Sequence, residues 1–479
     1  MNPACASFRD PDGRLIRWQN RVLRALNLSG EESLRRVLAS SRTQSFIERG
    51  LIVSTRFLDP ADAQEVLGAP DVSALLRDMK SPAVVEHAAA PFVNYPHEWA
   101  PEMLHAAGGL TIELARSFLP EGIGLKDATP ANVMFWGPQP VFLDVLSFER
   151  RDPYDPTWLP YTQFVRTFLL PLLVNRRYQI PLDQIFITRR DGLEPGDVYP
   201  LLSPLERLRP RSLPLITFPV WFGKRAANSS TIYEPRRLKN AEQARFILST
   251  LFRAQQQALN RLHPKTDLDS RWSGYMAGNN NYADAGFEAK RQFVRHSLSE
   301  IRPAAVLDLG CNTGVFSLLA AELGARVVAV DSDPVVIGML WRVAQEKAVS
   351  VLPLVVNIAQ PTPAVGWANA ECRSFLERAT GAFDVVLMLA LIHHLLVTDR
   401  IPLREIFQTA RRLTRRWLIV EYIGPSDSMF KRLTRGREHL HRDFSRGAFE
   451  QAAQSCFRII RSEELAQADR RLYLLEAST

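Results

Sequence analysis

The sequence contains few cysteines and no long apolar run, and each shortage excludes a class of protein. Its four cysteines are Cys5, Cys311, Cys372 and Cys456. They lie far apart and form no Cys-x-x-Cys pair, so we expect neither a zinc site nor a disulfide framework. The longest apolar candidate for a membrane span, residues 168–174, contains Pro171 and is much shorter than the roughly 20 residues that a transmembrane helix needs. The sequence therefore predicts no metal site and no membrane span.

Lysine is also scarce. Only eight of the 59 basic residues are lysines, and the net charge of +8 weakly favours an anionic partner without establishing one. The first residues, MNPACASFRDPDG, have neither the basic start nor the apolar core of a secretory signal, so we expect a cytoplasmic protein. With 479 residues, 46% hydrophobic and 23% charged, the composition is that of a globular chain of two or three domains.

Residues 304–331 have the pattern of a strand, a tight turn, a helix and a second strand. Residues 306–310 are predicted to form a buried parallel strand that enters the turn, residues 315–323 the helix, and residues 326–330 the second strand. The second strand ends at Asp331, a position that suits an acid holding ribose hydroxyls. This order predicts a dinucleotide or nucleoside site.

The turn itself favours a nucleoside. A dinucleotide turn has the pattern G-x-G-x-x-G, with a third glycine and a helix dipole aimed at a pyrophosphate. That third glycine is missing here. The residues present, Asp308-x-Gly310-x-Asn312-x-Gly314, resemble motif I of the class I S-adenosylmethionine-dependent methyltransferases. That family commonly has glycine at the position of Asn312, and asparagine is the other residue that readily adopts positive φ. The resemblance implies S-adenosyl-L-methionine as cofactor and a Rossmann-like fold.

The strands that follow complete a seven-stranded sheet. They are predicted at residues 351–356, 383–389, 417–423, 457–462 and 471–476. Ligands of such sheets bind at the carboxyl ends of the strands. We therefore expect one crevice to be faced by Asp308, Asp331, Asn357, Leu389 and Glu421.

The resemblance also assigns the remaining cofactor residues. It implies that Asn357 accepts a hydrogen bond from the adenine amino group and that Ser332, directly after Asp331, contacts the cofactor. It further implies an N-terminal cover with Tyr275 or Tyr282 near the methionine end and Lys290 near the carboxylate. The alternative for this stretch is a polar linker followed by a helix with a solvated lysine.

Three residues are candidates for catalysis. His393 and His394 follow the fourth strand, where the resembling family often has a histidine facing the substrate, and a neutral imidazole there can take a proton from a hydroxyl or amine. At most one of two adjacent histidines is expected to face the substrate, and the alternative is a structural role. Glu421 ends the fifth strand, where it either orients a substrate or binds a nearby arginine.

The first half of the chain carries a second constellation. Asp127, Asn132 and Asp144, the last closing an apolar strand, resemble in their spacing the catalytic loop and metal-binding aspartate of protein-kinase-like and aminoglycoside-phosphotransferase-like folds. The resemblance implies that the first Asp accepts the substrate proton, while Asn and the second Asp hold Mg²⁺. No glycine-rich loop is present, and the strand that should carry the ATP-binding lysine offers only Arg21 and Arg24.

The order of elements before Asp127 also fits such a fold. We expect a hairpin around residues 10–13, strands at 22–26, 51–57 and 84–87, and helices at 31–49 and 101–118. The alternative is that Asp127 and Asn132 merely form a turn and a cap.

The chain as a whole resembles bacterial class I methyltransferases related to rhizobial nodulation proteins of the NoeA type. The stretches that carry the resemblance are NYPHEWAPEML, LKDATPANVMF, PVFLDVLSFE, DLGCNTGVFS and VGWANAECRSFLERA. We expect an α/β chain with a degenerate α+β kinase-like domain and helical connector at residues 1–265 and a Rossmann-like, seven-stranded methyltransferase domain at residues 266–479.

The resemblance implies methyl transfer but does not name the acceptor. The only dense basic cluster, residues 431–442, has no interleaved aromatics, which argues against a nucleic acid and favours a small molecule or a saccharide. Two other functions stay open. One is an active phosphotransferase with an accessory methyltransferase domain, and the other is a non-catalytic binding protein.

Overall fold

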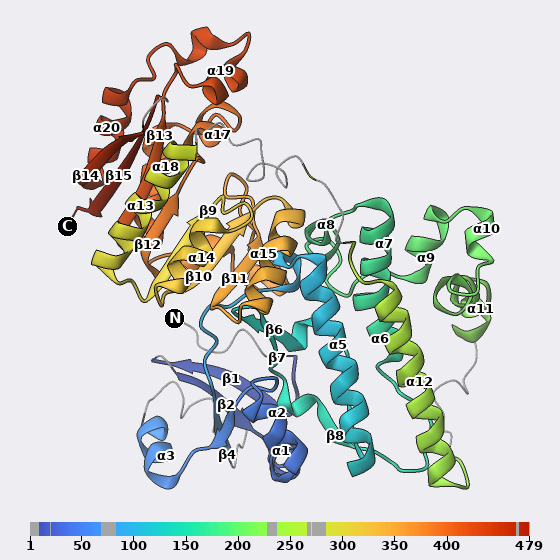
Figure 1. Cartoon of the computed structure of the whole chain (residues 1–479). Coiled ribbons are helices and arrows are strands. Elements are labelled where there is room, and N and C mark those ends of the chain that lie inside the picture. Colours follow the sequence, from blue (N-terminus) through green and yellow to red (C-terminus); the bar gives the residue numbers. More distant parts are fainter. Residues whose placement is uncertain are drawn as a thin grey trace. The chain divides into compact units, whose positions relative to one another are not determined.

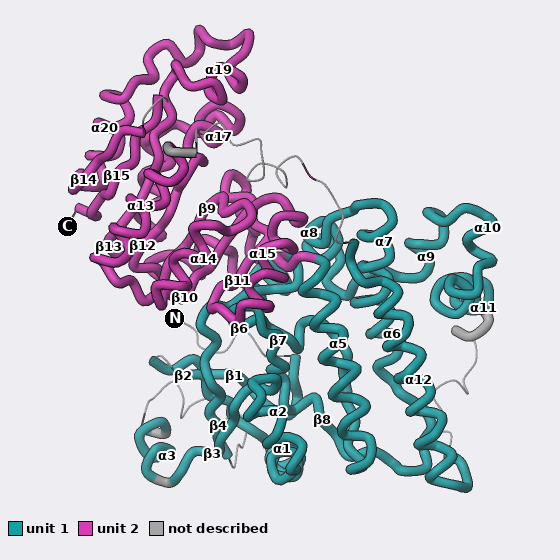
Figure 2. Tube along the Cα trace, in the orientation of Figure 1, with its two compact units in different colours: residues 1–97, 101–265, 365–372 teal, residues 98–100, 266–364, 373–479 magenta. Residues whose placement is uncertain are grey.

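The computed structural model describes residues 9–19, 21–68, 83–227, 237–265, 270, 284–465 and 469–478. The chain forms two compact units (Figure 2). Unit 1 comprises residues 1–97, 101–265 and 365–372, and unit 2 comprises residues 98–100, 266–364 and 373–479. In the described part of the chain, no helix combines the length and the apolar composition that crossing a membrane requires.

Unit 1 begins with a four-stranded antiparallel sheet in the order β1-β2-β4-β3 (Figure 1). Its strands are β1 Gly13–Trp18, β2 Arg21–Leu26, β3 Thr55–Phe57 and β4 Ala83–His87. The helices of this region are α1 Leu28–Ala39, α2 Ser41–Glu48 and α3 Pro60–Leu67. Ile16, Leu23, Ala25 and Val66 form a buried core here.

Three expectations for this region need correction. The predicted hairpin around residues 10–13 is wrong, because that stretch precedes β1 and the chain reverses between β1 and β2. The predicted helix over residues 31–49 is two helices, since Ser40 is extended (φ −69°, ψ 130°) and its side chain accepts from Arg42 N and Thr43 N to begin α2. The strand expected at 51–57 shrinks to β3, and Ile52 makes only an isolated bridge to Phe142.

The remainder of unit 1 is mostly helical. The long helix α5 Pro101–Phe118 is largely buried and packs beside α12 Ala241–Arg261, where Gly108 leaves room for Leu259. Two short antiparallel pairs follow α5, namely β5 Ile123–Leu125 with β8 Phe148–Arg150, and β6 Val133–Trp136 with β7 Gln139–Phe142. The other helices are α6 Tyr161–Phe164, α7 Leu170–Tyr178, α8 Leu182–Phe186, α9 Pro195–Val198, α10 Pro204–Arg207 and α11 Phe218–Ala227.

Unit 2 contains the predicted seven-stranded sheet, in the order β11-β10-β9-β12-β13-β15-β14. The strands are β9 Ala305–Leu309, β10 Arg326–Asp331, β11 Val351–Val355, β12 Phe383–Met388, β13 Thr414–Ile423, β14 Phe457–Leu465 and β15 Arg470–Ala477. The first five are parallel, and β15 pairs antiparallel with β13 and β14. Near-continuous burial along these five strands is typical of a parallel sheet that is covered on both faces.

Helices connect these strands as the apolar periodicity predicts. They are α13 Asp284–Ile301, α14 Val315–Glu322, α15 Pro334–Glu346, α16 Phe375–Ala379, α17 Ile392–Val397, α18 Leu403–Leu413, α19 Ser428–Thr434 and α20 Arg446–Gln454. From β9 the chain builds β10 and β11 on one side, and it then crosses to place β12 on the other side of β9. Such a reversal of strand order opens a crevice at the carboxyl ends of the central strands.

The turn between β9 and α14 requires three residues with positive φ. These are Gly310 (φ 71°), Asn312 (φ 50°) and Gly314 (φ 82°). Asn312 thus adopts the positive φ that was expected for an asparagine at this position. The amides of Gly310 and Cys311 both donate to the carbonyl of Val330, which ties the turn to the end of β10.

Two short segments, residues 98–100 and 365–372, each belong to the unit other than the one that flanks them in the sequence. Glu98, from NYPHEWAPEML, belongs to unit 2, where it is buried and its carboxylate pairs with Arg378 and accepts from Thr362 Oγ1 at 2.6 Å. Glu371, from VGWANAECRSFLERA, belongs to unit 1, where it pairs with Arg9 and Arg190. The expected division at residue 265 therefore leaves out two short segments: residues 98–100, which belong to unit 2, and residues 365–372, which belong to unit 1.

Candidate functional site

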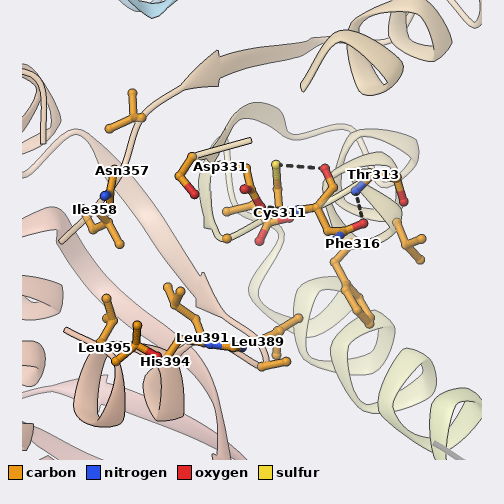
Figure 3. Close-up of a pocket in the computed structure, with 18 of the residues that line it drawn as sticks. Cys311, Thr313, Phe316, Asp331, Asn357, Ile358, Leu389, Leu391, His394 and Leu395 are labelled. Carbon is orange, nitrogen blue, oxygen red and sulfur yellow. Dashed lines mark hydrogen bonds between the residues drawn. The ribbon is translucent and has the colours of Figure 1, made fainter. Parts of the chain in front are cut away.

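A cavity of about 320 Å³ opens at the carboxyl ends of β9, β10, β11 and β12 (Figure 3). The residues that follow each strand line it, with Gly310 after β9, Ser332 after β10, Asn357 after β11 and Leu389 after β12. Among the predicted cofactor residues, those lining the cavity are Lys290, Asp308, Gly310, Asn312, Asp331, Ser332, Asn357 and Leu389. The structure thus gathers side chains from separate elements at one crevice of ligand size.

Asp331 organises the floor of this cavity. Its Oδ2 accepts the amide of Asn312 at 2.9 Å, and its Oδ1 accepts the amide of Asp333 at 3.0 Å. Burial raises the pKa of Asp331, while these amides act in the opposite direction. A carboxylate has about four lone-pair sites, so acceptor capacity remains after these two bonds.

Asp308 is more deeply buried than Asp331. Only 2% of its surface is exposed, and burial raises its pKa to about 6 although its Oδ2 accepts from Ser317 Oγ at 2.6 Å. Asp399 also lines the cavity, and partial burial raises its pKa. Three carboxyl groups therefore face a cavity in which Lys290 is the one basic side chain besides His394 among the described lining residues.

Lys290 is already paired inside the protein. Its Nζ lies 2.7 Å from Glu421 Oε2, and both side chains are buried. Burial lowers the pKa of Lys290, and Glu421 acts against that shift. Glu421 also lies 3.5 Å from Arg470 Nη1, and Arg470 in turn binds Asp427 at 2.8 Å. Two cations and two anions thus balance each other in the interior, as buried charges require.

This network corrects one prediction. Glu421 is fully buried and is not among the residues that line the cavity, so it does not face the crevice as expected. It binds an arginine, which was the alternative drawn from the sequence. Neither Arg470 nor Asp427 was predicted, because their pairing depends on contacts between distant strands.

The two adjacent histidines have different environments. His394, on α17, lines the cavity, and Figure 3 shows it beside Leu391 and Leu395. His393 does not line the cavity and is only 3% exposed, and burial keeps its pKa well below the ordinary value. His393 is therefore removed as a candidate base, and His394 is the histidine placed at the site.

Gly314 also has a structural role. It caps the start of α14 and does not line the cavity, and an added Cβ would lie 2.3 Å from Leu340 Cδ1.

Tyr275 and Tyr282 lie outside the described residues. Sequence reasoning missed the lining residues Cys311, Thr313, Val315, Phe316, Val356, Ile358, Ala390, Leu391, Leu395, Thr398 and Asp399. Most lie within two or three residues of a predicted strand end, which is a usable signal.

In unit 1, the kinase-like residues also come together. Ser147 Oγ contacts the backbone amide of Asp127 at 3.2 Å and the side chain of Asn132 at 3.5 Å, and the amide of Ser147 donates to the carbonyl of Asp144. The carboxylate of Asp144 is bound by Arg24, with Nη1 at 2.9 Å from Oδ1. A guanidinium thus occupies one face of the carboxylate that the resemblance assigns to Mg²⁺.

Comparisons with known proteins bear on unit 2 and on the whole chain. Residues 282–470 match the family described as a methyltransferase domain. The nodulation protein NoeA of Rhizobium meliloti (strain 1021) is 29% identical over 98% of this chain and 95% of its own length. A ribosomal protein L11 methyltransferase of Herpetosiphon aurantiacus is 34% identical over 112 residues, covering 21% of this chain and 34% of that protein.

Among solved structures, the N-methyltransferase NodS of Bradyrhizobium japonicum WM9, in complex with S-adenosyl-l-homocysteine, is 15% identical with a TM-score of 0.32. The match covers 47% of this chain and 98% of NodS. The family match over 282–470 and the acid-lined cavity that the same residues form lead to one conclusion. The chain carries a methyltransferase domain over residues 282–470 and is an S-adenosylmethionine-dependent methyltransferase, and over nearly its whole length it is similar to NoeA.

Proposed function

We propose that the chain transfers a methyl group to a hydroxyl or amine of a small metabolite or saccharide, at the cavity of unit 2. The observation that carries this proposal is the charge of the cavity. Asp308, Asp331 and Asp399 line it, whereas Lys290 is neutralised by Glu421. A field of this sign stabilises a sulfonium and an ammonium group and opposes a pyrophosphate.

The residues at the strand ends fit the cofactor. Asp331 retains acceptor capacity for ribose hydroxyls. Asn357 Oδ1 accepts the amide of Ala359 at 3.0 Å and keeps a lone pair for an adenine amino group. Leu389 and Leu391 supply an apolar wall for a base. When bound, the cofactor supplies an electrophilic methyl group, and positioning the acceptor is the main task left to the protein.

His394 is the residue proposed to move a proton. It is half-buried at the cavity, so a neutral imidazole there can accept the proton that an acceptor hydroxyl or amine loses. Glu421 and His393 have no such access, since both are buried away from the lining. General-base catalysis of this kind contributes roughly 10² to 10⁴ in rate.

The surface near the end of β13 informs the choice of acceptor. Lys431, Arg432, Arg435 and Arg437 are exposed around α19. None of them lines the cavity, and no aromatic platform accompanies them among the lining residues apart from Phe316. Binding of single-stranded nucleic acid uses a continuous basic groove with stacking aromatics. We therefore favour a small metabolite or a saccharide over RNA.

The acceptor is tested with cofactor labelled in its methyl group, incubated with fractionated cell extract. The expected result is label in the small-molecule or glycolipid fraction, with an Asp331→Ala protein as the control for background transfer. Label that moves only into ribosomal or transfer RNA would show that the proposed acceptor class is wrong.

A phosphotransferase activity of unit 1 is the second candidate, because Asp127, Asn132 and Asp144 gather around Ser147. The ion pair of Arg24 with Asp144 opposes it, since an arginine cannot be deprotonated and competes with Mg²⁺ for the carboxylate. If unit 1 does not transfer phosphate, its remaining proposed role is to bind a partner or glycan for the methyltransferase.

A further inference from the structure

Unit 1 contains a second cavity that neither the methyltransferase nor the kinase-like residues use. Its volume is about 740 Å³, within the range of pockets that hold drug-sized ligands. Its walls are α7, residues 202–215 and one face of α12, all in unit 1. Figure 1 shows these helices in green and yellow-green. None of Asp127, Asn132 or Asp144 lines this cavity.

Five leucines line the cavity. Leucines enter it from every wall, with Leu173 on α7, Leu202 and Leu215 on the 202–215 stretch, and Leu251 and Leu262 on or just after α12. Besides Gln257, the positions of α12 that line the cavity are 251, 254, 255, 258 and 261, which recur at helical spacing and form one stripe. The other buried face of α12, with Phe252 and Leu259, belongs to the core of the unit. Within the stripe Leu251, Ala254 and Ala258 are apolar, and none of the three belongs to the buried core, so they form an apolar surface left for another occupant.

One polar group inside this lining lacks a partner. Gln255 is only 5% exposed, and its Oε1 has no hydrogen-bond partner among the described residues. A buried amide oxygen costs free energy unless a donor reaches it. Because Gln255 lines the cavity, a hydroxyl or amine of a ligand is the group that would satisfy it.

The rim of the cavity is basic. Arg211, Arg261 and Lys265 line it and are exposed, and no carboxylate pairs with any of them among the described residues. By contrast, Arg177 at the same cavity is bound to Glu206. Three unpaired cations beside an apolar chamber are suited to an anionic headgroup such as a phosphate or a carboxylate.

The segment that continues from the wall exposes large apolar side chains. The π-helical turn Leu213–Thr217 contributes Pro214 and Leu215 to the cavity and runs directly into α11. On α11, Phe218, Trp221 and Phe222 are 44%, 47% and 51% exposed and share one face. Exposed aromatics of this kind favour contact with a lipid surface.

We propose that this cavity binds a single-chain amphiphile, with its apolar tail against α12 and α7 and its phosphate or carboxylate at Arg211, Arg261 and Lys265. A hydroxyl near the headgroup would donate to Gln255. The site is independent of the proposed methyl transfer, and its ligand is drawn either from solution or from a membrane.

The test is displacement of a fluorescent dansyl-labelled undecanoic acid from the full-length protein. Decyl phosphate should displace it, decyl glucoside should do so about tenfold less well, and inorganic phosphate alone should not. Leu251→Trp should abolish binding by filling the cavity, and Arg211→Ala with Arg261→Ala should weaken it about tenfold. The matched control is Arg253→Ala, because Arg253 is an exposed residue of α12 whose side chain bonds Ser249 and Thr250. This variant should bind like the wild type.

Absence of probe binding to the wild type would overturn the proposal. So would equal binding by the wild type and the Arg211→Ala, Arg261→Ala protein, which decides the matter even if Leu251→Trp fails to fold. The source of the ligand is tested by uptake of lysophosphatidic acid from phosphatidylcholine vesicles. A membrane is the source if the Trp221→Ala variant takes up this lipid more slowly than the wild type but binds decyl phosphate equally well. Binding of monomers without uptake from vesicles would support the same site with a dissolved ligand.

Discussion

Replacing Gly314 with alanine should destabilise the turn on which the cofactor site is built. Two costs arise from the structure. The first is the backbone, because φ of 82° costs a residue with a Cβ roughly 1–2 kcal/mol. The second is packing, because the new Cβ would lie 2.3 Å, 2.7 Å and 2.9 Å from Cδ1, Cδ2 and Cγ of Leu340.

Leu340 has no room to move, since its side chain is fully buried. Overpacking of this kind costs about 1–3 kcal/mol. Alanine also restricts the unfolded chain, which returns about 0.4–1 kcal/mol. The expected net loss is about 2–4 kcal/mol, or roughly 30- to 900-fold in an opening equilibrium.

The assay is hydrogen exchange of the amides in β9 and α14, with unit 1 peptides as the internal reference. Gly324→Ala is the matched control, because Gly324 has φ of 92° but nothing within 4 Å of an added Cβ. The Gly324→Ala variant should be destabilised by only about 1 kcal/mol, which is the net cost of holding alanine at positive φ. If Gly314→Ala opens no faster than Gly324→Ala, the packing of the turn against Leu340 is not what stabilises it.

Three further predictions concern the two units. Burial raises the pKa of Asp308 to about 6, so in the empty cavity its neutral form predominates only below about pH 6, and a bound sulfonium favours the ionised form. Affinity for S-adenosylmethionine measured by calorimetry should therefore rise between pH 5 and 7, and it should rise more than the affinity for S-adenosylhomocysteine, which lacks the sulfonium charge. Equal slopes for the two ligands would contradict this prediction. The sign for folding is opposite, since a raised carboxyl pKa contributes stability below about pH 4 that is lost as pH rises through about 6. His394→Asn should lower kcat about 100-fold with cofactor affinity unchanged, whereas a matched loss of affinity would indicate a binding role. Because Arg24 holds Asp144, ATP with Mg²⁺ should not shift the thermal unfolding of unit 1, and a clear shift in the wild type would restore the phosphotransferase hypothesis.

The seven-stranded sheet was predictable because its signals are local. The apolar runs that form β9, β10 and β12 are bounded by turn residues, and Asn312 adopts the positive φ that its residue type allows. Strand ends in turn place Asp308, Asp331, Asn357 and Leu389 at one crevice, and all four line the cavity of unit 2. The kinase-like assignment of unit 1 stays a prediction.

What could not be predicted depends on contacts between distant residues. Lys290 and Glu421 are 131 residues apart, and only the folded sheet shows that they neutralise each other instead of facing a ligand. Helical periodicity continues through residues 31–49, so the break at Ser40 is visible only from its capping hydrogen bonds to the next helix. The roles of Glu98 and Glu371 likewise follow from ion pairs to residues far along the chain.

We propose that the acid-lined cavity of unit 2 binds S-adenosylmethionine through Asp331. The most direct measurement is isothermal titration of the cofactor into the wild type, Asp331→Ala and Asp333→Ala. Asp333 is the matched acid two residues on, which caps α15 by accepting from Val335 N and does not line the cavity. We predict binding to the wild type and to Asp333→Ala, and at least tenfold weaker binding to Asp331→Ala. No binding to the wild type at about millimolar cofactor, or equal binding by all three proteins, would show that Asp331 does not hold the cofactor in this cavity.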